Sequence, residues 1–293
     1  MNLKAYLKSR QEKIERALDR HLPKENTKPA TIHKAMRYSL FAGGKRLRPI
    51  LCLAAAEACG GRIDNALPLA CTLECIHTYS LVHDDLPSMD NDDLRRGRPT
   101  CHKVFGDGIA VLAGDALLTI AFEIVSRAKP TSRYNMSILL REIAVAAGSQ
   151  KLIAGQVADL EAEGRKANRA QLRYIHENKT AAILTTSVRL GAMSANADAR
   201  KLNAITKFGR ALGLAFQIID DILDVTQTSE KLGKSAGKDV AAKKATYPAV
   251  IGLEKSRAEA RRLTRQAHQA LSIFNRKAEA LHSLANYLLE REY

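Results

Sequence analysis

Two clusters of aspartates lie far apart in this chain of 293 residues, and they say more about its chemistry than any other feature. The clusters comprise Asp84, Asp85 and Asp90, and then Asp220, Asp221 and Asp224. Each follows an apolar run, TYSLVH or LAFQII, and carboxylates crowded beside apolar surface repel one another unless cations neutralise them. Mg²⁺ binds through one or two carboxylates and fills its other sites with water and substrate phosphate. The sequence therefore predicts that two facing clusters hold metal ions and, through them, a polyphosphate.

The second cluster is expected to form the edge of a helix, because Asp220 and Asp224 are four residues apart and share one face. The first cluster cannot be built in that way. Asp84 and Asp90 are six residues apart, and the intervening Pro87 is poorly tolerated in a helix interior. We expect a helix to end at the first pair of aspartates and Asp90 to return from a loop to the same ions. Solvated acids at a helix end are the alternative, although negative charge is unfavourable there.

Basic residues supply a second group of candidate ligands. Arg95 and Arg96 follow the first cluster, and a basic turn contains Lys45, Arg46 and Arg48. Arginine offers phosphate a planar fork of donors, whereas lysine acts as a point charge. Taken singly, each group is typical of a solvated surface. Combined with the aspartates, they favour two anion sites, one bound through metals and one bound directly.

Two further positions have both a structural and a functional interpretation. His77 lies seven residues before Asp84 on the same helical face, where a histidine of the core would also lie. Lys179, followed by Thr180, is in an apolar segment, where it could extend to solvent or hold phosphate inside a cavity. The residues alone leave both alternatives open.

The elements that position these residues are predicted to be helices, and the fold class is all-α. Alternating β-branched runs are scarce, and residues 131–247 contain no proline. We expect Gly43 and Gly44 to end a helix that precedes the basic turn. Further helices are expected over 65–85, 137–160, 170–192 and 201–225. The absence of linkers and repeats favours one domain over residues 1–293.

Composition bears on the environment and the partners. The net charge of +15 favours anionic ligands or a solvated basic surface. The five cysteines form no CxxC pair, and we expect buried thiols in a cytoplasmic protein. No run of about 18 apolar residues is apparent, so stable membrane insertion is not expected.

The chain resembles the trans-isoprenyl diphosphate synthases, specifically the bacterial short-chain enzymes of the farnesyl diphosphate synthase type. The motifs that carry the resemblance occur in family order between residues 43 and 248: GGKRLRP, ECIHTYSLVHDDLPSMDNDDLRRGRPTCH, LAGDALL, GQVADL, KTAAIL, FQIIDDILD, GKSAGKD and KKATYP. The resemblance implies the isoprenoid synthase fold, a bundle of about ten helices around a deep central cavity. It also implies a homodimer.

The resemblance implies roles for individual residues. About three Mg²⁺ ions per active site, for which Mn²⁺ can substitute, would be held by Asp84, Asp85, Asp90, Asp220 and Asp224. The allylic diphosphate would be contacted by Arg95, Lys179, Thr180, Gln217, Lys234 and Lys244. Isopentenyl diphosphate would be contacted by Lys45, Arg48, His77 and Arg96. The five aspartates, Arg95 and Lys179 form the expected catalytic set, and near the C-terminus only Arg291 could help to close the site.

The expected reaction condenses isopentenyl diphosphate with dimethylallyl and then geranyl diphosphate to give (2E,6E)-farnesyl diphosphate. Tyr79, five residues before Asp84, should form the floor of the cavity, and the small Ser80 should leave room beside it. Geranyl or geranylgeranyl diphosphate is the nearest alternative product.

Other function classes fit less well. A class I terpene cyclase would not need the basic turn. A nucleic-acid-binding protein would gain nothing from the acidic clusters, and no recognition motif is visible, so nucleic acid is not an expected partner. A non-catalytic subunit would not need intact aspartates.

Overall fold

The computed structural model describes residues 1–164, 167–226 and 246–289, and this part of the chain is almost entirely helical. Its α-helices are α1 (Leu3–His21), α2 (Ala30–Leu40), α3 (Leu47–Ala58), α4 (Ile63–Asp84), α5 (Cys101–Phe105), α6 (Asp107–Ser126), α7 (Met136–Ala147), α8 (Leu152–Ala162), α9 (Arg169–Ile175), α10 (Ala182–Ser194), α11 (Ala199–Thr226), α14 (Tyr247–Ile251), α15 (Leu253–Ala270) and α16 (Glu279–Leu289). A π-helical turn η1 (His176–Ala181), a 3-10 turn η2 (Ser272–Ala278) and a hairpin of β1 (Leu94–Arg95) and β2 (Arg98–Pro99) complete it. The predicted all-α class is confirmed.

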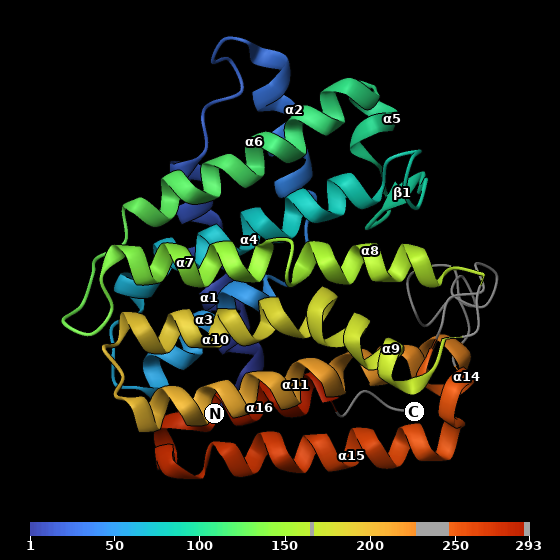
Figure 1. The fold of residues 1–293 in the computed structure, drawn as a ribbon. Helices are drawn as coiled ribbons and strands as arrows, with labels where there is room; N and C mark the ends of the chain where they lie inside the picture. Colours follow the sequence, from blue (N-terminus) through green and yellow to red (C-terminus); the bar gives the residue numbers. More distant parts are fainter. Residues whose placement is uncertain (165–166, 227–245, 290–293) are drawn as a thin grey trace.

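The helices form successive layers. Figure 1 shows α6, α4, the α7–α8 pair, α10, α11 and α15 stacked one below another, with most axes running in similar directions. The innermost helices α3 and α10 face each other with small, apolar side chains. Gly191 of α10 lies so close to the Cys52 carbonyl of α3 that a Cβ at this position would overlap the carbonyl oxygen. Close backbone approach of this kind buries both helices and fixes the parts of α4 and α11 that flank them.

The helix boundaries follow the sequence at the sites and depart from it elsewhere. α4 and α11 match the expected helices over 65–85 and 201–225 within two residues at each end. The continuous helix expected over 137–160 is wrong, whereas the helix expected over 170–192 is confirmed as one helical run with a π-helical turn inside it. Gly148, in an extended conformation, separates α7 from α8, whereas η1 is a six-residue π-helical turn within a run that stays helical from α9 to α10. The apolar pattern of the sequence reveals neither feature, because the residues on both sides of each one keep the spacing of an amphipathic helix.

One helix contradicts the expectation that no segment could span a membrane. α6 has 20 residues, and its most apolar stretch of 18 residues has a mean hydropathy of 1.9. Of this stretch, 44% is buried inside the protein. Its buried residues, including Ala113, Leu117 and Ala121, belong to the face that packs against α4. A core helix of a bundle has this length and composition too, and the packing on α4 accounts for them.

Candidate active site

The first aspartate cluster is built from a helix end and a returning loop, as predicted. α4 ends at Asp84, and the Asp90 N–H donates a 2.8 Å hydrogen bond to the Asp84 carbonyl. The pKa of the Asp84 carboxyl is raised to about 6, chiefly by burial; Lys179 opposes the shift and Asp90 adds to it. The half-buried Asp84 carboxylate therefore has less positive charge beside it than its ionised form requires.

Asp85 differs from the expectation that it faces the metals. Its carboxylate is 3% exposed, and Arg95 Nε donates to its two oxygens at 2.9 and 3.2 Å. Consecutive helical residues point about 100° apart, so Asp85 cannot share the direction of Asp84. In this structure Asp85 and Arg95 therefore engage each other in an ion pair, whereas each was expected to contact the metals or the diphosphate.

The second cluster places its aspartates in different surroundings along α11. Asp220 is half-buried and lies within electrostatic range of Arg48. Asp224, one helical turn further, is 4% exposed, and neither of its carboxylate oxygens has a hydrogen-bond partner in the described part of the chain. A buried carboxylate without a partner is costly, and a bound cation would remove that cost.

Asp221 is oriented toward another part of the bundle. Its carboxylate accepts a 2.9 Å hydrogen bond from the Tyr247 N–H and a 3.2 Å bond from Gln217 Nε2. Gln217 Oε1 in turn accepts the Thr180 hydroxyl at 3.0 Å. His176 Nε2 lies 3.6 Å from Asp221, and its ring stacks on that of Tyr247 with centroids 5.3 Å apart. This network joins α11 to η1 and to the start of α14, and it brings together two predicted ligands, Thr180 and Gln217.

Lys179 lies in the π-helical turn, and α8 determines its position. Its ammonium forms a 2.6 Å ion pair with Asp159. Gly155, one turn earlier on α8, is packed against the Lys179 backbone so closely that a Cβ would overlap it. Sequence reasoning quoted the motif GQVADL without assigning Asp159 a role. The spacing of Gly155 and Asp159, four residues apart on one helical face, is the signal that could have found it.

A separate basic group surrounds His77. Burial lowers the pKa of His77 well below its usual value, and Arg48 and Arg96 are the next largest causes. Burial also lowers the pKa of Arg48 to about 10. The negative charges of Glu74 and Asp220 raise this pKa, whereas the positive charge of Arg96 lowers it further. Three of the four residues predicted to hold the second anion thus lie together, next to an aspartate of the second cluster.

The remaining basic residues of the turn do not join that group. Arg46, with a left-handed backbone (φ 49°), is 2% exposed, and its guanidinium pairs with Glu15 at 2.6 Å and Glu74 at 2.8 Å. Because it also donates to the Leu40 carbonyl, Arg46 ties the basic turn to α1, α2 and α4. Lys45 is exposed, with its ammonium 5.4 Å from the centre of the Tyr287 ring. Sequence reasoning missed Glu74, a buried acid that spacing alone does not distinguish from a surface residue.

The hairpin after the first cluster positions Arg96. Arg96 and Gly97 have φ of 56° and 76° and form the two-residue turn between β1 and β2, a geometry typical of type I′ hairpins. The Arg96 guanidinium donates to the Gly43 carbonyl and packs on Gly44, where a Cβ would overlap it. The paired glycines of GGKRLRP are therefore needed for close approach as well as for ending a helix.

The predicted chain-length residues lie on α4. Tyr79 is 6% exposed, and burial, together with the negative charge of Asp84, raises its pKa to about 12. Its ring meets that of His83 edge-on at 5.8 Å, and His83 packs on Gly114 of α6, where a Cβ would overlap it. Ser80 donates to the His77 carbonyl at 3.0 Å. Tyr79 is therefore a buried residue of α4, five positions before Asp84, with its ring against His83.

The oxygen ligands of the two clusters suit Mg²⁺. Carboxylate oxygens are ligands for a hard divalent cation. Asp224, which has no hydrogen-bond partner among the described residues, and Asp84, with its raised pKa, both favour one. Among the described residues, no group of three or more acidic, histidine or cysteine side chains is close enough to hold a metal unaided. The carboxylates therefore fit ions that complete their coordination with phosphate and water. Lys234, Lys244 and Arg291 lie outside the described residues.

Comparison with known proteins agrees with this geometry. The family model described as polyprenyl synthetase matches residues 29–284. The large subunit 1 of a heterodimeric geranylgeranyl pyrophosphate synthase from Arabidopsis thaliana is 49% identical over 98% of this chain and 79% of its own. Six other curated relatives at 46–50% identity are also named geranylgeranyl synthases or subunits of one.

Solved structures share the whole fold. An FPP/GFPP synthase from Zymomonas mobilis in its apo form has a TM-score of 0.85 and 36% identity, covering 98% of this chain and 99% of its own. A geranyltransferase from Helicobacter pylori complexed with magnesium and isoprenyl diphosphate has a TM-score of 0.86 and 34% identity, with 99% of both chains covered. This chain belongs to the polyprenyl synthetase family, the trans-isoprenyl diphosphate synthases.

Proposed function

We propose that this prenyltransferase condenses isopentenyl diphosphate with short allylic diphosphates. The observation that carries the proposal is that one aspartate of each cluster has a cation within electrostatic range: Lys179 for Asp84, and Arg48 for Asp220. The site thus offers two anion-binding positions that share a boundary. A terpene cyclase, which binds one diphosphate, would have no use for the basic group around His77.

The allylic diphosphate is assigned to the aspartate side. Asp84, Asp90, Asp220 and Asp224 would hold the Mg²⁺ ions, while Asp85 and Asp221 hold neighbouring protein groups in place. When bound, these ions neutralise the diphosphate and make it a better leaving group. Lys179 adds a direct positive charge, and Asp159 keeps its ammonium in position until phosphate competes for it.

Isopentenyl diphosphate is assigned to the basic group. Arg48 and Arg96 supply the positive charge, and the depressed pKa of His77 leaves its ring neutral and able to donate one hydrogen bond. An anion bound here would relieve the mutual repulsion of the arginines. Lys45, on the surface beside Tyr287, would contribute only after its side chain moves.

Between the two anions, the chain's contribution is orientation and exclusion of water. The double bond of isopentenyl diphosphate attacks the allylic carbon as the C–O bond breaks, and one proton leaves the new intermediate. Thr180 and Gln217, already hydrogen-bonded to each other, fix the wall of the site at the departing diphosphate. We assign the departing diphosphate as the proton acceptor.

For the product, we propose geranylgeranyl diphosphate, since most curated relatives carry that name. This replaces the farnesyl diphosphate expected from the sequence. Farnesyl diphosphate is the second candidate, because Tyr79 is buried on α4 within electrostatic range of Asp84, and we infer that its ring stops a growing chain at fifteen carbons.

We also propose a homodimer, formed through apolar residues that α6 and α8 expose. Val111 and Leu112 are 41% and 55% exposed, and Ile153 and Val157 are 44% and 47% exposed. Burial of such side chains stabilises association by about 25 cal/mol per Å² of apolar surface. The Arabidopsis relative is named as a subunit of a heterodimer, so light scattering of the purified chain should decide between a homodimer and a monomer that awaits a partner.

The decisive experiment is to incubate the chain with Mg²⁺, isopentenyl diphosphate and each allylic primer, and to size the products. Twenty carbons from every primer would support the main proposal. Fifteen carbons, lengthened by Tyr79→Ala, would support the second candidate. Cyclic hydrocarbon formed without isopentenyl diphosphate, or no product at all, would reject both.

A further inference from the structure

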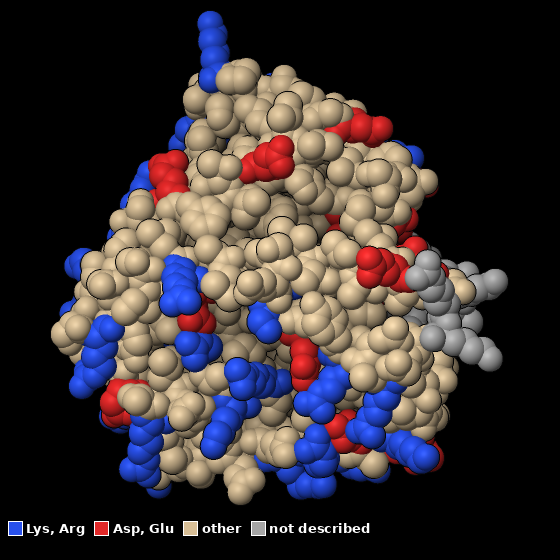
Figure 2. Space-filling model, viewed as in Figure 1, with Lys and Arg blue, Asp and Glu red and all other residues tan. Residues whose placement is uncertain are grey.

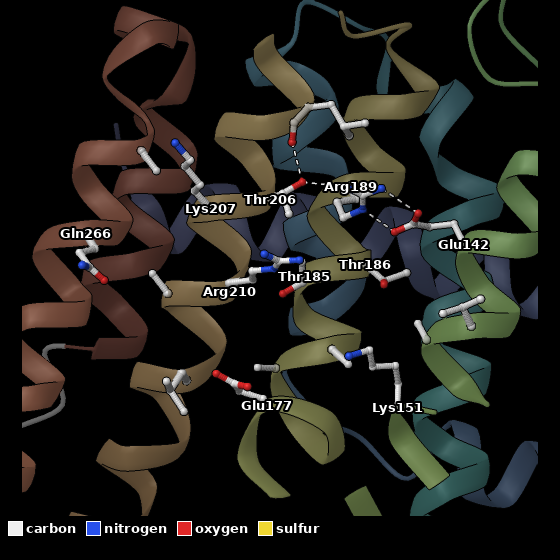
Figure 3. Close-up of a pocket in the computed structure, with 18 of the residues that line it drawn as sticks. Glu142, Lys151, Glu177, Thr185, Thr186, Arg189, Thr206, Lys207, Arg210 and Gln266 are labelled. Carbon is white, nitrogen blue, oxygen red and sulfur yellow. Dashed lines mark hydrogen bonds and ion pairs between the residues drawn. The ribbon is translucent and has the colours of Figure 1, made fainter. Parts of the chain in front are cut away.

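A large cavity among the described residues is a groove that none of the aspartates lines. It has a volume of about 1510 Å³ and lies between α7 and α15, with α10 and α11 beneath it (Figure 3). None of the residues assigned above to the active site lines it. Ala181, Ala211 and Leu214 contribute apolar surface to its floor. The groove is therefore separate from the site described above.

The charge of the groove is strongly positive. Its lining contains seven lysines and arginines against two acids, Glu142 and Glu177, a net charge of +5. Each acid is already paired: Glu142 with Arg189 at 2.5 Å, and Glu177 with Arg173 at 2.7 Å. Figure 2 shows Lys and Arg gathered over the lower half of this face, where α10, α11 and α15 lie.

Three of the cations carry most of the unbalanced charge. Arg141 on α7 and Lys207 and Arg210 on α11 are exposed, and none has a carboxylate partner in the part of the chain that the structure describes. Figure 3 shows Lys207, Arg210 and Lys151 spread along the groove without converging on one point. An extended anion fits this arrangement better than a single phosphate group, which needs convergent donors.

The size of the groove favours a helix as the occupant. A helix with its side chains is about 10–12 Å across and rises 1.5 Å per residue, so about 12 residues fill a volume of this order. Small-molecule sites usually occupy about 300–1,000 Å³. The long helices α7 and α15 form two walls, and the floor offers both apolar contacts and Arg210. An amphipathic helix laid in a groove uses both kinds of contact.

Other occupants match these features less well. The homodimer proposed above is formed through apolar residues of α6 and α8, so a second copy of this chain is assigned to those helices and not to this groove. Single-stranded nucleic acid binds by stacking bases on aromatic rings, yet Tyr134 is the only aromatic residue that lines this groove, and it is 9% exposed. A bilayer surface is flat and cannot follow a floor recessed between two helices.

We propose that the groove between α7 and α15 binds an acidic amphipathic helix of a partner protein. This proposal is independent of the reaction at the aspartates. The partner's acidic side chains meet Arg141, Lys207 and Arg210, and its apolar side chains meet the floor. The excess of positive charge on this face then has a binding function.

The test uses a fluorescently labelled peptide of about 16 residues with glutamate on one helical face and leucine on the other. Its controls replace every glutamate by lysine, or scramble the order. The groove variant combines Lys207→Glu with Arg210→Glu. A matched control combines Arg261→Glu with Arg265→Glu, two exposed residues of α15 outside the groove lining. Arg141→Glu on the opposite wall provides a second groove variant, and circular dichroism with thermal unfolding establishes that each is folded.

Binding of the acidic helix should weaken at least about 10-fold in either groove variant and less than about 2-fold in the matched control. Affinity should fall with added salt, and the two control peptides should not bind. Equal weakening in groove and control variants would overturn the proposal, because it would show attraction by bulk charge. So would failure of the acidic peptide to bind, equal binding of the scrambled peptide, or tighter groove-dependent binding of an RNA oligonucleotide or of phosphatidylglycerol vesicles.

Discussion

The two aspartate clusters stand on different backbones, yet each divides its adjacent pair in the same way. The first ends α4 and continues in a loop, whereas the second lies within the continuous helix α11. In both, the leading aspartate, Asp84 or Asp220, is half-buried beside a cation across the site. The following one, Asp85 or Asp221, is 3% exposed and holds a neighbouring group.

Helix geometry explains this division. Adjacent residues point about 100° apart, so two consecutive aspartates cannot both face one ligand. One can reach the ligand, and the other is available to fix the wall that surrounds it. The comparison therefore predicts that leading and following aspartates fail in different ways when substituted.

Loss of a leading aspartate should have the largest effect. Asp84→Ala and Asp220→Ala should each lower kcat by about 10³-fold, since each removes charge that stabilises the leaving diphosphate. Activity should also vanish in excess chelator. Steady-state kinetics measures the loss, and unchanged circular dichroism serves as the control. Near-normal turnover in either variant would remove that residue from the ligand set.

The cations beside the leading aspartates should separate the two substrates. Arg48→Ala should weaken isopentenyl diphosphate by about 10–100-fold, because one charge-assisted contact contributes about 1.5–3 kcal/mol. Lys179→Ala should do the same to the allylic substrate. The KM values for the two substrates provide the measurement. Equal effects on both substrates in both variants would show that the site is not divided.

The following aspartates should affect stability more than chemistry. Asp221→Ala leaves the Tyr247 N–H and the Gln217 amide without their acceptor, and Asp85→Ala leaves Arg95 without its main partner. Each should lower the free energy of unfolding by about 1–3 kcal/mol, measured in urea. Asp84→Ala is the matched control and should not lose stability, because burial disfavours the ionised Asp84 carboxylate. If the control loses as much, the distinction between leading and following positions fails.

Asp84→Asn should stabilise the metal-free protein. The pKa of Asp84 is raised from 3.8 to about 6 in the folded state, so its ionisation opposes folding. The penalty is absent below pH about 4 and grows as pH rises to about 6. At pH 7.5 in chelator the variant should be about 1–2 kcal/mol more stable, allowing for the half-buried position. Thermal unfolding of the variant and of the unchanged protein, at pH 7.5 and at pH 4, measures the difference in stability. A gain of the same size at pH 4 would contradict the electrostatic cause.

Much of the candidate site was accessible from residue types and spacing. Pro87 between the aspartates predicted the helix end and the returning loop, and the Asp90 N–H bond to the Asp84 carbonyl shows that loop. The i, i+4 spacing correctly put Asp220 and Asp224 on one helix. The sequence did not distinguish Arg46, which pairs with a buried acid, from Arg48, which lies beside His77. The two side chains have the same chemistry, and only the backbone decides the direction in which each one points.

Sequence by itself determined the helical class, the family and the residues able to bind cations and phosphate, because those depend on composition, periodicity and side-chain chemistry. Tertiary structure alone decided which of those residues meet. Arg46 is neutralised by Glu15 and Glu74, which are 31 and 28 positions away, and Lys179 by Asp159, 20 positions away. The groove between α7 and α15 likewise exists only once four helices have packed. Pairings of this kind depend on helix crossing and on close approach at Gly44, Gly155 and Gly191, which no local pattern encodes.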